Sequence, residues 1–309
     1  MKGKTTPVSG ETHFGAMGII ILCLLCCSDW LDAAEAKGRP VKLVMLGDSV
    51  TQSRLAPEGD KVPQLTEKSL SKHLSGRLAW TVVNAGVGSE TAEGGLRRVA
   101  GVLTRETPQF VTIAYGLNDC RRKDPKWFEQ EMRALIDEIA KHPSKPQLIV
   151  LTATPFVNEH HAYSADPFYA GQGGLDAFLD RQMNAVTRRL AAERRLPLID
   201  VHRAFLRMAD WQNLIQNDGV HPTVEGNRLI SEEVARGLGA YVEARLSSES
   251  KAANAEKSAR AKLAQAVKAA SSPANRDEAY KLLQDAADLC PYLAEVWVGL
   301  DSLEATATK

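Results

Sequence analysis

The 309-residue chain is 44% hydrophobic and 25% charged, which is ordinary for a globular protein and excludes a disordered or fibrous class. Lysine plus arginine equals aspartate plus glutamate at 38 each, so no overall charge attracts nucleic acid or an anionic membrane surface. A neutral or weakly charged substrate is therefore the simpler expectation.

The first 36 residues have the pattern of an export signal. An apolar run from Ala16 to Cys27 is too short to span a bilayer and follows a polar segment with Lys2 and Lys4. The sequence Ala-Glu-Ala ending at Ala36 fits a signal peptidase, so we expect cleavage there and a secreted or periplasmic protein. An uncleaved anchor and a lipoprotein are the less favoured alternatives. Cleavage removes three of the five cysteines, so we expect packing rather than disulfides to stabilise the remainder.

From residue 41 onward, short aliphatic runs alternate with longer amphipathic stretches, which is typical of a parallel sheet flanked by helices. The predicted strands are Val41 to Leu46, Thr81 to Asn84, Phe110 to Tyr115, Gln147 to Leu151 and Leu198 to Asp200. The predicted helices are Gln64 to Leu74, Thr91 to Leu103, Trp127 to Lys141, Leu175 to Glu193 and Thr223 to Leu246. We therefore expect a three-layer α/β domain with a parallel five-stranded sheet over residues 37–248.

The longest irregular segment, residues 154–174, follows the fourth predicted strand at the edge where open α/β sheets bind ligands. It contains His160 and His161, a pair that invites a metal hypothesis. Adjacent side chains diverge and no third ligand stands at a suitable spacing, so we expect no metal and interpret the pair as exposed or pocket-lining residues. The nearby run Arg121-Arg122-Lys123 could contact an acidic substrate, and a solvated turn is the simpler interpretation.

Beyond residue 248 the composition shifts to alanine, lysine, glutamate and serine, which predicts a helical extension over residues 249–309. Within it, residues 277–303 hold two apolar helical faces separated by Pro291, similar to part of a tetratricopeptide array. Such arrays need about three repeats to bury a core, and this chain offers barely one. We therefore favour a helical hairpin that packs on the α/β domain or trails it, with binding of a protein partner through residues 277–303 as the alternative.

A serine, a histidine and a carboxylate stand where nucleophilic catalysis needs them. Ser49 follows the first predicted strand directly, at the carboxyl edge of the sheet. A serine hydroxyl needs a base within hydrogen-bond reach, and that base needs a group that fixes its tautomer. Near the end of the domain, Asp218 lies three residues before His221. We expect Asp218 to accept from Nδ1 of His221, which leaves Nε2 to take the Ser49 proton.

Acyl transfer also requires donors aimed at the oxyanion that develops on the substrate carbonyl. Gly86, in a glycine-rich segment after the second predicted strand, can present its backbone N–H. Asn118, after the third strand, can donate its side-chain amide from the opposite side. Asp48 and Asp119 are interpreted as structural residues of the two turns, and no base spacing marks Cys120 as a nucleophile.

Four short sequence blocks carry these groups, each beside a predicted strand end or the last predicted helix: Gly47-Asp48-Ser49, Gly86, Gly116-x-Asn118-Asp119 and Asp218-x-x-His221. In this order they resemble the signature blocks of the GDSL (SGNH) hydrolase family, over residues 41–246. The resemblance implies a flavodoxin-like fold, no cofactor or metal, and hydrolysis of esters or thioesters through an acyl-enzyme. It further implies Ser49 as nucleophile and first oxyanion donor, Gly86 and Asn118 as further donors, His221 as base and Asp218 as its orienter.

The substrate is the least specified part of this prediction. No long apolar lid segment points to a lipid interface, so short acyl groups are favoured, such as acetyl esters of carbohydrates. A lysophospholipase or thioesterase is the alternative within the family. The rival from another class is a non-catalytic secreted interaction module, which would have no physical need for Ser49, Asp218 and His221 together.

Overall fold

The computed structural model describes residues 38–74, 76–247 and 250–307. The predicted signal peptide, residues 1–36, lies outside the described residues. No helix in the described part of the chain is long and apolar enough to cross a membrane.

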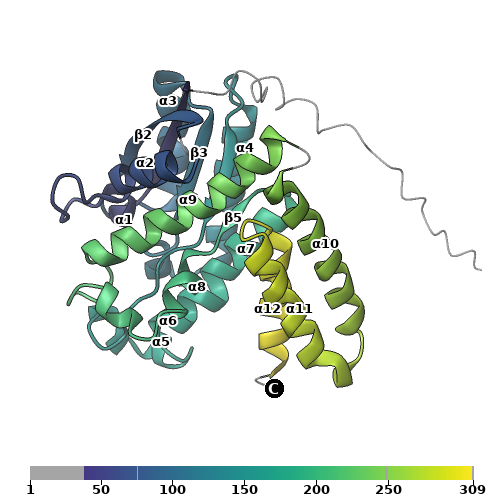
Figure 1. The fold of residues 1–309 in the computed structure, drawn as a ribbon. Helices are drawn as coiled ribbons and strands as arrows, with labels where there is room; N and C mark the ends of the chain where they lie inside the picture. The colour runs from purple at the N-terminus through teal and green to yellow at the C-terminus, as the bar shows by residue number, and fades with distance from the viewer. Residues whose placement is uncertain (1–37, 75, 248–249, 308–309) are drawn as a thin grey trace, which may run out of the picture. The chain divides into compact units, whose positions relative to one another are not determined.

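Five parallel strands form one sheet in the order β2-β1-β3-β4-β5 (Figure 1). The strands are β1 (Arg39–Gly47), β2 (Leu78–Gly86), β3 (Phe110–Ala114), β4 (Gln147–Leu151) and β5 (Leu198–Ile199). All five predicted strands are present, and their order is the flavodoxin-like doubly wound one. The winding reverses between β1 and β3, so a ligand crevice is expected at the carboxyl ends of these two strands.

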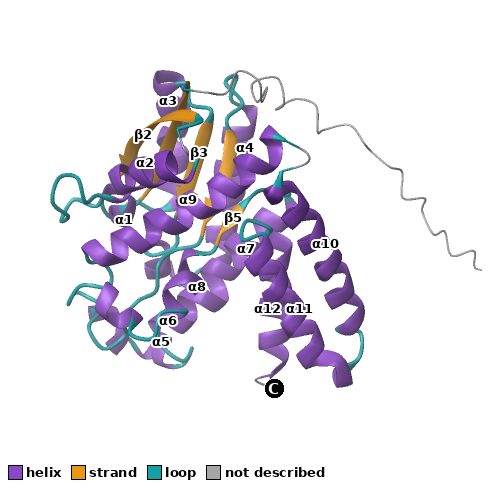
Figure 2. Ribbon diagram, in the orientation of Figure 1, coloured by secondary structure: helices purple, strands orange, loops and turns teal. Residues whose placement is uncertain are grey.

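Helices cover both faces of the sheet (Figure 2). They are α1 (Ser49–Gln52), α2 (Val62–His73), α3 (Ala92–Glu106), α4 (Pro125–Lys141), α5 (Pro167–Ala170), α6 (Leu175–Phe178), α7 (Ala185–Glu193), α8 (Val201–Leu206), α9 (Val224–Leu246), α10 (Lys251–Ala269), α11 (Arg276–Leu289) and α12 (Ala294–Ala307). Helices α2 and α9 pack together on one face, and α3, α4 and α7 pack on the other. Because both faces are covered, the inner strands are almost wholly apolar and buried.

The predicted helix from Leu175 to Glu193 is divided into α6, a π-helical turn over Leu179–Asn184 and α7. The turn lets the Asn184 side chain bind both backbone groups of Ala153, at 2.9 Å to its N–H and 3.3 Å to its carbonyl. Ala153 lies just beyond β4, so this contact fixes the backbone where the long irregular segment begins.

The carboxy-terminal helices pack on the α/β domain. Helix α12 lies against α7, and the Leu198 N–H of β5 donates to the Tyr292 carbonyl at 3.0 Å. Trp297 and Leu300 of α12 are only 4% and 2% exposed. The segment before α12 therefore covers the edge strand of the sheet, which would otherwise present unpaired backbone groups. The similarity to tetratricopeptide repeats and the domain division at residue 248 remain predictions.

Candidate active site

Ser49 is the first residue of α1, at the carboxyl end of β1. The Asp48 carboxylate caps this short helix by accepting from the Val50 N–H at 2.9 Å. A Cβ at Gly47 would lie 2.2 Å from Thr51 Oγ1, so only glycine allows the chain to turn so sharply here. The turn presents the Ser49 hydroxyl at the sheet edge where the ligand crevice is expected.

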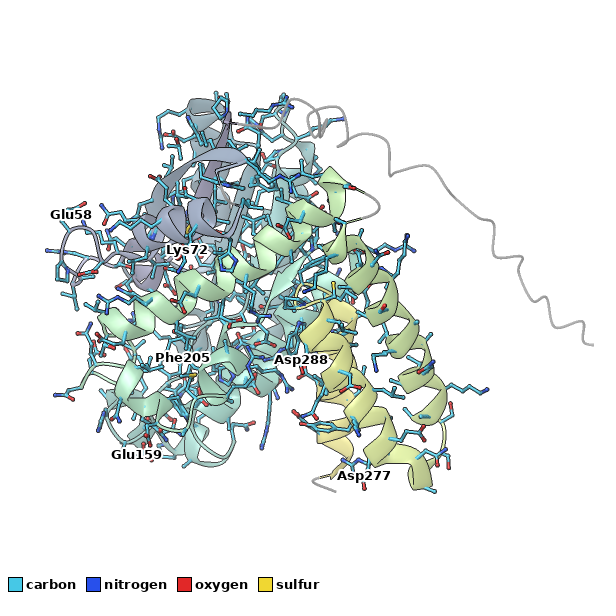
Figure 3. All side chains as sticks on the ribbon, viewed as in Figure 1. Glu58, Lys72, Glu159, Phe205, Asp277 and Asp288 are labelled. Atoms are coloured by element: carbon cyan, nitrogen blue, oxygen red, sulfur yellow. The ribbon has the colours of Figure 1, made fainter. Side chains whose placement is uncertain are left out.

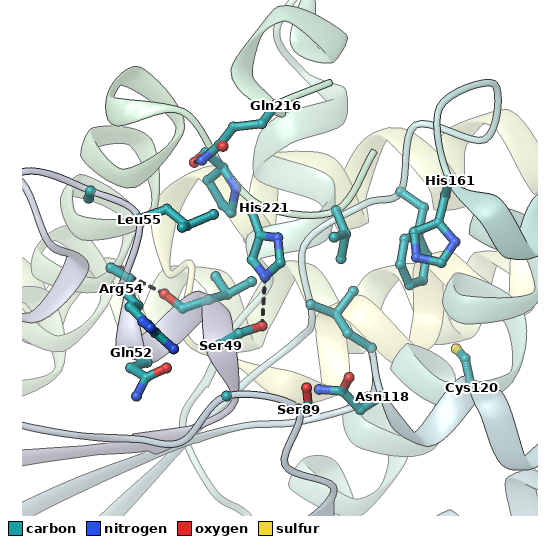
Figure 4. A pocket seen from close by; sticks show the side chains of 18 of the residues that line it. Ser49, Gln52, Arg54, Leu55, Ser89, Asn118, Cys120, His161, Gln216 and His221 are labelled. Carbon is teal, nitrogen blue, oxygen red and sulfur yellow. Dashed lines mark hydrogen bonds between the residues drawn. The ribbon is translucent and has the colours of Figure 1, made fainter. Parts of the chain in front are cut away.

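Asp218, His221 and Ser49 form one continuous chain of contacts (Figure 4). Nδ1 of His221 lies 2.6 Å from Asp218 Oδ2, and its Nε2 lies 2.9 Å from Ser49 Oγ. The other Asp218 oxygen accepts from the backbone N–H groups of Val220 and His221 at 2.9 and 3.0 Å. Partial burial raises the pKa of Asp218, but these donors outweigh it and hold the pKa below its ordinary value. Asp218 is therefore an ionised acceptor for the imidazole.

The loop that carries the histidine is fixed by a tight turn. Gly219 has φ +74°, and a Cβ there would lie 2.7 Å from the Val157 carbonyl. The Gly219 carbonyl accepts from the Val157 N–H at 2.9 Å, and the His221 carbonyl accepts from the Gln216 N–H at 2.7 Å. These contacts hold the base loop against the segment after β4.

Asn118 lines the pocket next to Ser49 and is positioned by the turn after β2. Its Nδ2 donates to the Glu90 carbonyl at 3.0 Å, which leaves a second amide hydrogen. The neighbouring Asp119 carboxylate accepts from the N–H groups of Ala92 and Gly116, both at 3.0 Å. Asp119 thus ties the turns after β2 and β3 together, and burial raises its pKa to about 6.

Ser49, Asn118 and His221 line the pocket, whereas Gly86 does not. Its N–H donates to Asn84 Oδ1 at 3.0 Å, so the group expected to face the oxyanion already has a partner. A Cβ at Gly86 would lie 2.2 Å from the Gln52 backbone nitrogen, so glycine is needed for the close approach of α1 to β2. Ser89 lines the pocket instead, with φ +61° and no partner for its N–H among the described residues.

A pocket of about 340 Å³ opens around Ser49 and His221. Its walls include Phe156 and His161 from the segment after β4, which the sequence marked as a functional loop. Cys120 also borders the pocket, but its side chain is buried, and burial raises the pKa of the thiol well above its ordinary value. Cys120 is therefore an unreactive wall residue.

The two adjacent histidines have different environments. His161 lines the pocket and its ring lies 4.9 Å from the Phe156 ring, whereas His160 is exposed and does not line it. Partial burial lowers the pKa of His161, so its ring is neutral near pH 7. In the described ranges no three histidine, cysteine or acidic side chains are grouped to hold a metal ion.

This chain is similar in sequence to known esterases and acylhydrolases. The model of the GDSL-like lipase/acylhydrolase family matches residues 45–229. The thioesterase 1/protease 1/lysophospholipase L1 of Escherichia coli strain K12 is 26% identical over 63% of this chain and 82% of the relative. An arylesterase of Vibrio mimicus is 27% identical over 71% of this chain and 95% of the relative. An acetylxylan esterase of Geobacillus stearothermophilus is 25% identical over 65% and 95%.

Among solved structures, a lipase/acylhydrolase from Enterococcus faecalis has a similar fold. It superposes with a TM-score of 0.53 at 22% identity, over 65% of this chain and 96% of its own. The shared part is the α/β domain, which carries Ser49, Asn118 and His221.

Proposed function

Because this chain belongs to the GDSL-like lipase/acylhydrolase family, whose members are ester hydrolases, we propose that it cleaves carboxylic esters through an acyl-enzyme on Ser49. The observation that carries this proposal is the unbroken contact from Asp218 through His221 to Ser49, which ends in the pocket. A serine with a base at 2.9 Å and a fixed base tautomer is an activated nucleophile.

The proposed reaction has two steps. His221 Nε2 takes the Ser49 proton as Oγ bonds to the ester carbonyl carbon, and the imidazolium then gives that proton to the departing alcohol oxygen. In the second step His221 takes a proton from water, whose oxygen attacks the acyl carbon. The imidazolium then returns this proton to Ser49 Oγ as the bond from Oγ to the acyl carbon breaks and the acid leaves. Asp218 stabilises the imidazolium in both steps without taking its proton.

The oxyanion is assigned to three donors around Ser49. These are the Ser49 N–H, the free amide hydrogen of Asn118 and the N–H of Ser89. Ser89 takes the role expected of Gly86, because its N–H has no partner among the described residues and its residue borders the pocket. Figure 4 shows Ser89 and Asn118 side by side, next to Ser49. One such donor contributes about 3 kcal/mol to transition-state stabilisation.

The proposed substrates are esters of short acyl groups, acetyl above all, with the hydroxyl groups of carbohydrates. Two findings support this: the pocket of about 340 Å³ lies near the lower limit for small-molecule sites, and one relative is an acetylxylan esterase. The alternative is a lysophospholipase or thioesterase, and it is supported by the name of the Escherichia coli relative. Rates on p-nitrophenyl acetate, butyrate and palmitate, then on acetylated xylan and a lysophospholipid, decide between them.

The direct test of the reaction compares wild type and Ser49→Ala on p-nitrophenyl acetate. The expected result is a loss of about 10³-fold or more in kcat for the variant. Ser71→Ala is the control, since Ser71 is an exposed serine of α2 and does not line the pocket. Equal rates for wild type and Ser49→Ala would refute the proposed function.

Export is proposed on the amino-terminal sequence alone, since residues 1–36 lie outside the described part. The apolar run and the Ala-Glu-Ala sequence ending at Ala36 support cleavage by a signal peptidase. Amino-terminal sequencing of the mature protein is the test, with Lys37 as the expected first residue. A retained Met1 would favour the uncleaved anchor.

A further inference from the structure

The pocket around Ser49 has a positive lining although the whole chain is neutral. Arg54 and Arg121 line it, and none of its lining residues in the described ranges is an aspartate or glutamate. Asp218 stands next to the pocket, but its oxygens bind His221 and the Val220 N–H. The pocket therefore presents two guanidinium groups with no carboxylate on its wall to neutralise them.

Arg121 is the one member of the run Arg121-Arg122-Lys123 that lines the pocket. The Arg122 guanidinium lies 4.2 Å from the centroid of the Trp127 ring, and the Lys123 ammonium forms an ion pair with Asp166. Arg121 is exposed and has no ion pair within the described ranges. The two neighbours thus have partners outside the pocket, and the Arg121 guanidinium is available to a ligand.

The surroundings of Arg121 suit an anion with two or more oxygens. Its guanidinium lies 5.6 Å from the Tyr163 ring centroid, and that ring lies 5.1 Å from the His161 ring. Tyr169 holds the turn from behind by donating to the Cys120 carbonyl at 2.7 Å. A guanidinium oriented by an aromatic face keeps its fork of N–H groups for a carboxylate or phosphate. His161 adds a neutral donor or acceptor at the same end.

Arg54 lies on the opposite side of the Ser49–His221 pair from Cys120 and His161 (Figure 4). It too is exposed and without an ion pair in the described ranges. The acidic side chains of the two loops beside the pocket do not line it. Glu58 pairs with Lys61, and Glu159 is exposed at the outer edge of the molecule (Figure 3).

We infer that this pocket selects esters whose alcohol part carries an anionic group, a carboxylate or a phosphate, which binds Arg121 while the acyl group lies at Ser49. The inference rests on the proposed function and narrows its substrate. The negative charge is assigned to the alcohol part of the ester because an acetyl group carries no ionisable group. Since the overall charge is balanced, attraction of such esters comes from the pocket and not from the surface as a whole.

The test uses three acetyl esters that share the phenyl acetate core and differ in the meta substituent of the alcohol, which is hydrogen, carboxylate or phosphate: phenyl acetate, 3-acetoxybenzoate and 3-acetoxyphenyl phosphate. The measured quantity is kcat/KM for each charged ester divided by that for phenyl acetate, in wild type, Arg121→Gln and Arg122→Gln. Arg122→Gln is the matched control, since it removes the same charge one residue away. The Arg122 side chain stacks on Trp127 and does not line the pocket.

Arg121→Gln is expected to lower this ratio about tenfold, the effect of losing one hydrogen bond to a charged group. The control keeps the wild-type ratio, and 0.5 M salt lowers the ratio in wild type. If the ratio falls only for 3-acetoxybenzoate, the anionic group of the substrate is a carboxylate, such as that of a uronate. If it falls only for 3-acetoxyphenyl phosphate, the anionic group is a phosphate.

An unchanged ratio in Arg121→Gln, or an equal fall in Arg122→Gln, would overturn the inference while leaving the proposed function intact. Absence of Ser49-dependent hydrolysis of all three esters would instead refute the proposed function, and this inference with it.

Discussion

Asp301 of α12 lies 2.8 Å from Arg203 of α8, although 98 residues separate them in the chain. The same carboxylate lies 3.3 Å from Arg188, which is 1% exposed and also binds Asp180 and Asp200. Burial lowers the pKa of Arg188, but these three carboxylates outweigh it and hold the pKa above its ordinary value. The last helix therefore supplies part of the charge balance of the α/β domain.

Asp301→Asn is expected to lower the free energy of unfolding by about 1 kcal/mol, because it removes one charge partner from a buried arginine that keeps two others. The loss is modest because burial raises the pKa of Asp301, which offsets part of the attraction to the two arginines. Urea unfolding of the full chain measures this. Asp288→Asn is the control, since that exposed residue of α11 (Figure 3) changes the same charge. Equal stability of the two variants would mean that α12 merely rests on the domain and that its role lies elsewhere.

Glu90 positions Asn118, one of the proposed oxyanion donors. Its carboxylate accepts from Arg98 and, at 2.8 Å, from the Tyr115 hydroxyl, while its carbonyl accepts from Asn118. Glu90→Gln weakens the contact with Arg98 and loosens the turn, so kcat is expected to fall about tenfold with little change in KM. Steady-state kinetics on phenyl acetate would show this.

Glu93→Gln is the control for that variant, because the Glu93 side chain is 42% exposed and forms an ion pair with Arg97 on its own helix. A parallel loss of activity in both variants, or a loss confined to KM, would remove Glu90 from the oxyanion machinery.

Asn118→Ala tests the donor itself. Removing one oxyanion donor costs about 10²–10³-fold in kcat, a larger loss than that expected for Glu90→Gln. The Nδ2 contact with the Glu90 carbonyl is lost as well, so thermal unfolding should be recorded beside the kinetics. A kcat within a few-fold of wild type would show that the amide does not face the oxyanion.

Asp48 makes folding stability depend on pH. Burial raises its pKa to about 7, so the folded protein keeps a proton that the unfolded chain releases near pH 4. The contribution of Asp48 to stability therefore falls as pH rises from about 4 to about 7 and is constant above that. Asp48→Asn cannot ionise, so its stability relative to wild type should rise by about 2 kcal/mol between pH 5 and pH 8.

Urea unfolding at the two pH values measures this difference, with Asp277→Asn as an exposed control that should show no such change. A stability difference between Asp48→Asn and wild type that is the same at pH 5 and pH 8 would mean that Asp48 is ionised in the folded protein at both.

The sequence predicted the strands and the contacts of His221 with Asp218 and Ser49 because both follow from local rules. Ser49 comes directly after β1, and the carboxyl ends of parallel strands share one edge, so the side chains that follow them meet there. His221 and Asp218 are three residues apart, which fixes their contact within one turn.

The sequence could not assign the remaining parts because they depend on tertiary contacts. In sequence Gly86 resembles a residue that donates its N–H to the oxyanion, but the structure shows that it is glycine because α1 approaches β2 closely there. Ser89 has a left-handed backbone conformation, which a serine in the sequence does not indicate. Likewise, the run Arg121-Arg122-Lys123 does not show in sequence which of its members lines the pocket, whereas in the structure Arg121 lines it and its two neighbours contact Trp127 and Asp166.

Covalent labelling of Ser49 tests the central claim most directly. The protein is treated with a fluorophosphonate, which phosphonylates an activated serine with loss of fluoride, and the modified peptide is identified by mass spectrometry in wild type, Ser49→Ala and His221→Ala. The account predicts one labelled residue, Ser49, with labelling abolished in Ser49→Ala and strongly slowed in His221→Ala, which lacks the base at 2.9 Å. Ester hydrolysis that persists in Ser49→Ala, or a label on another residue, would contradict it.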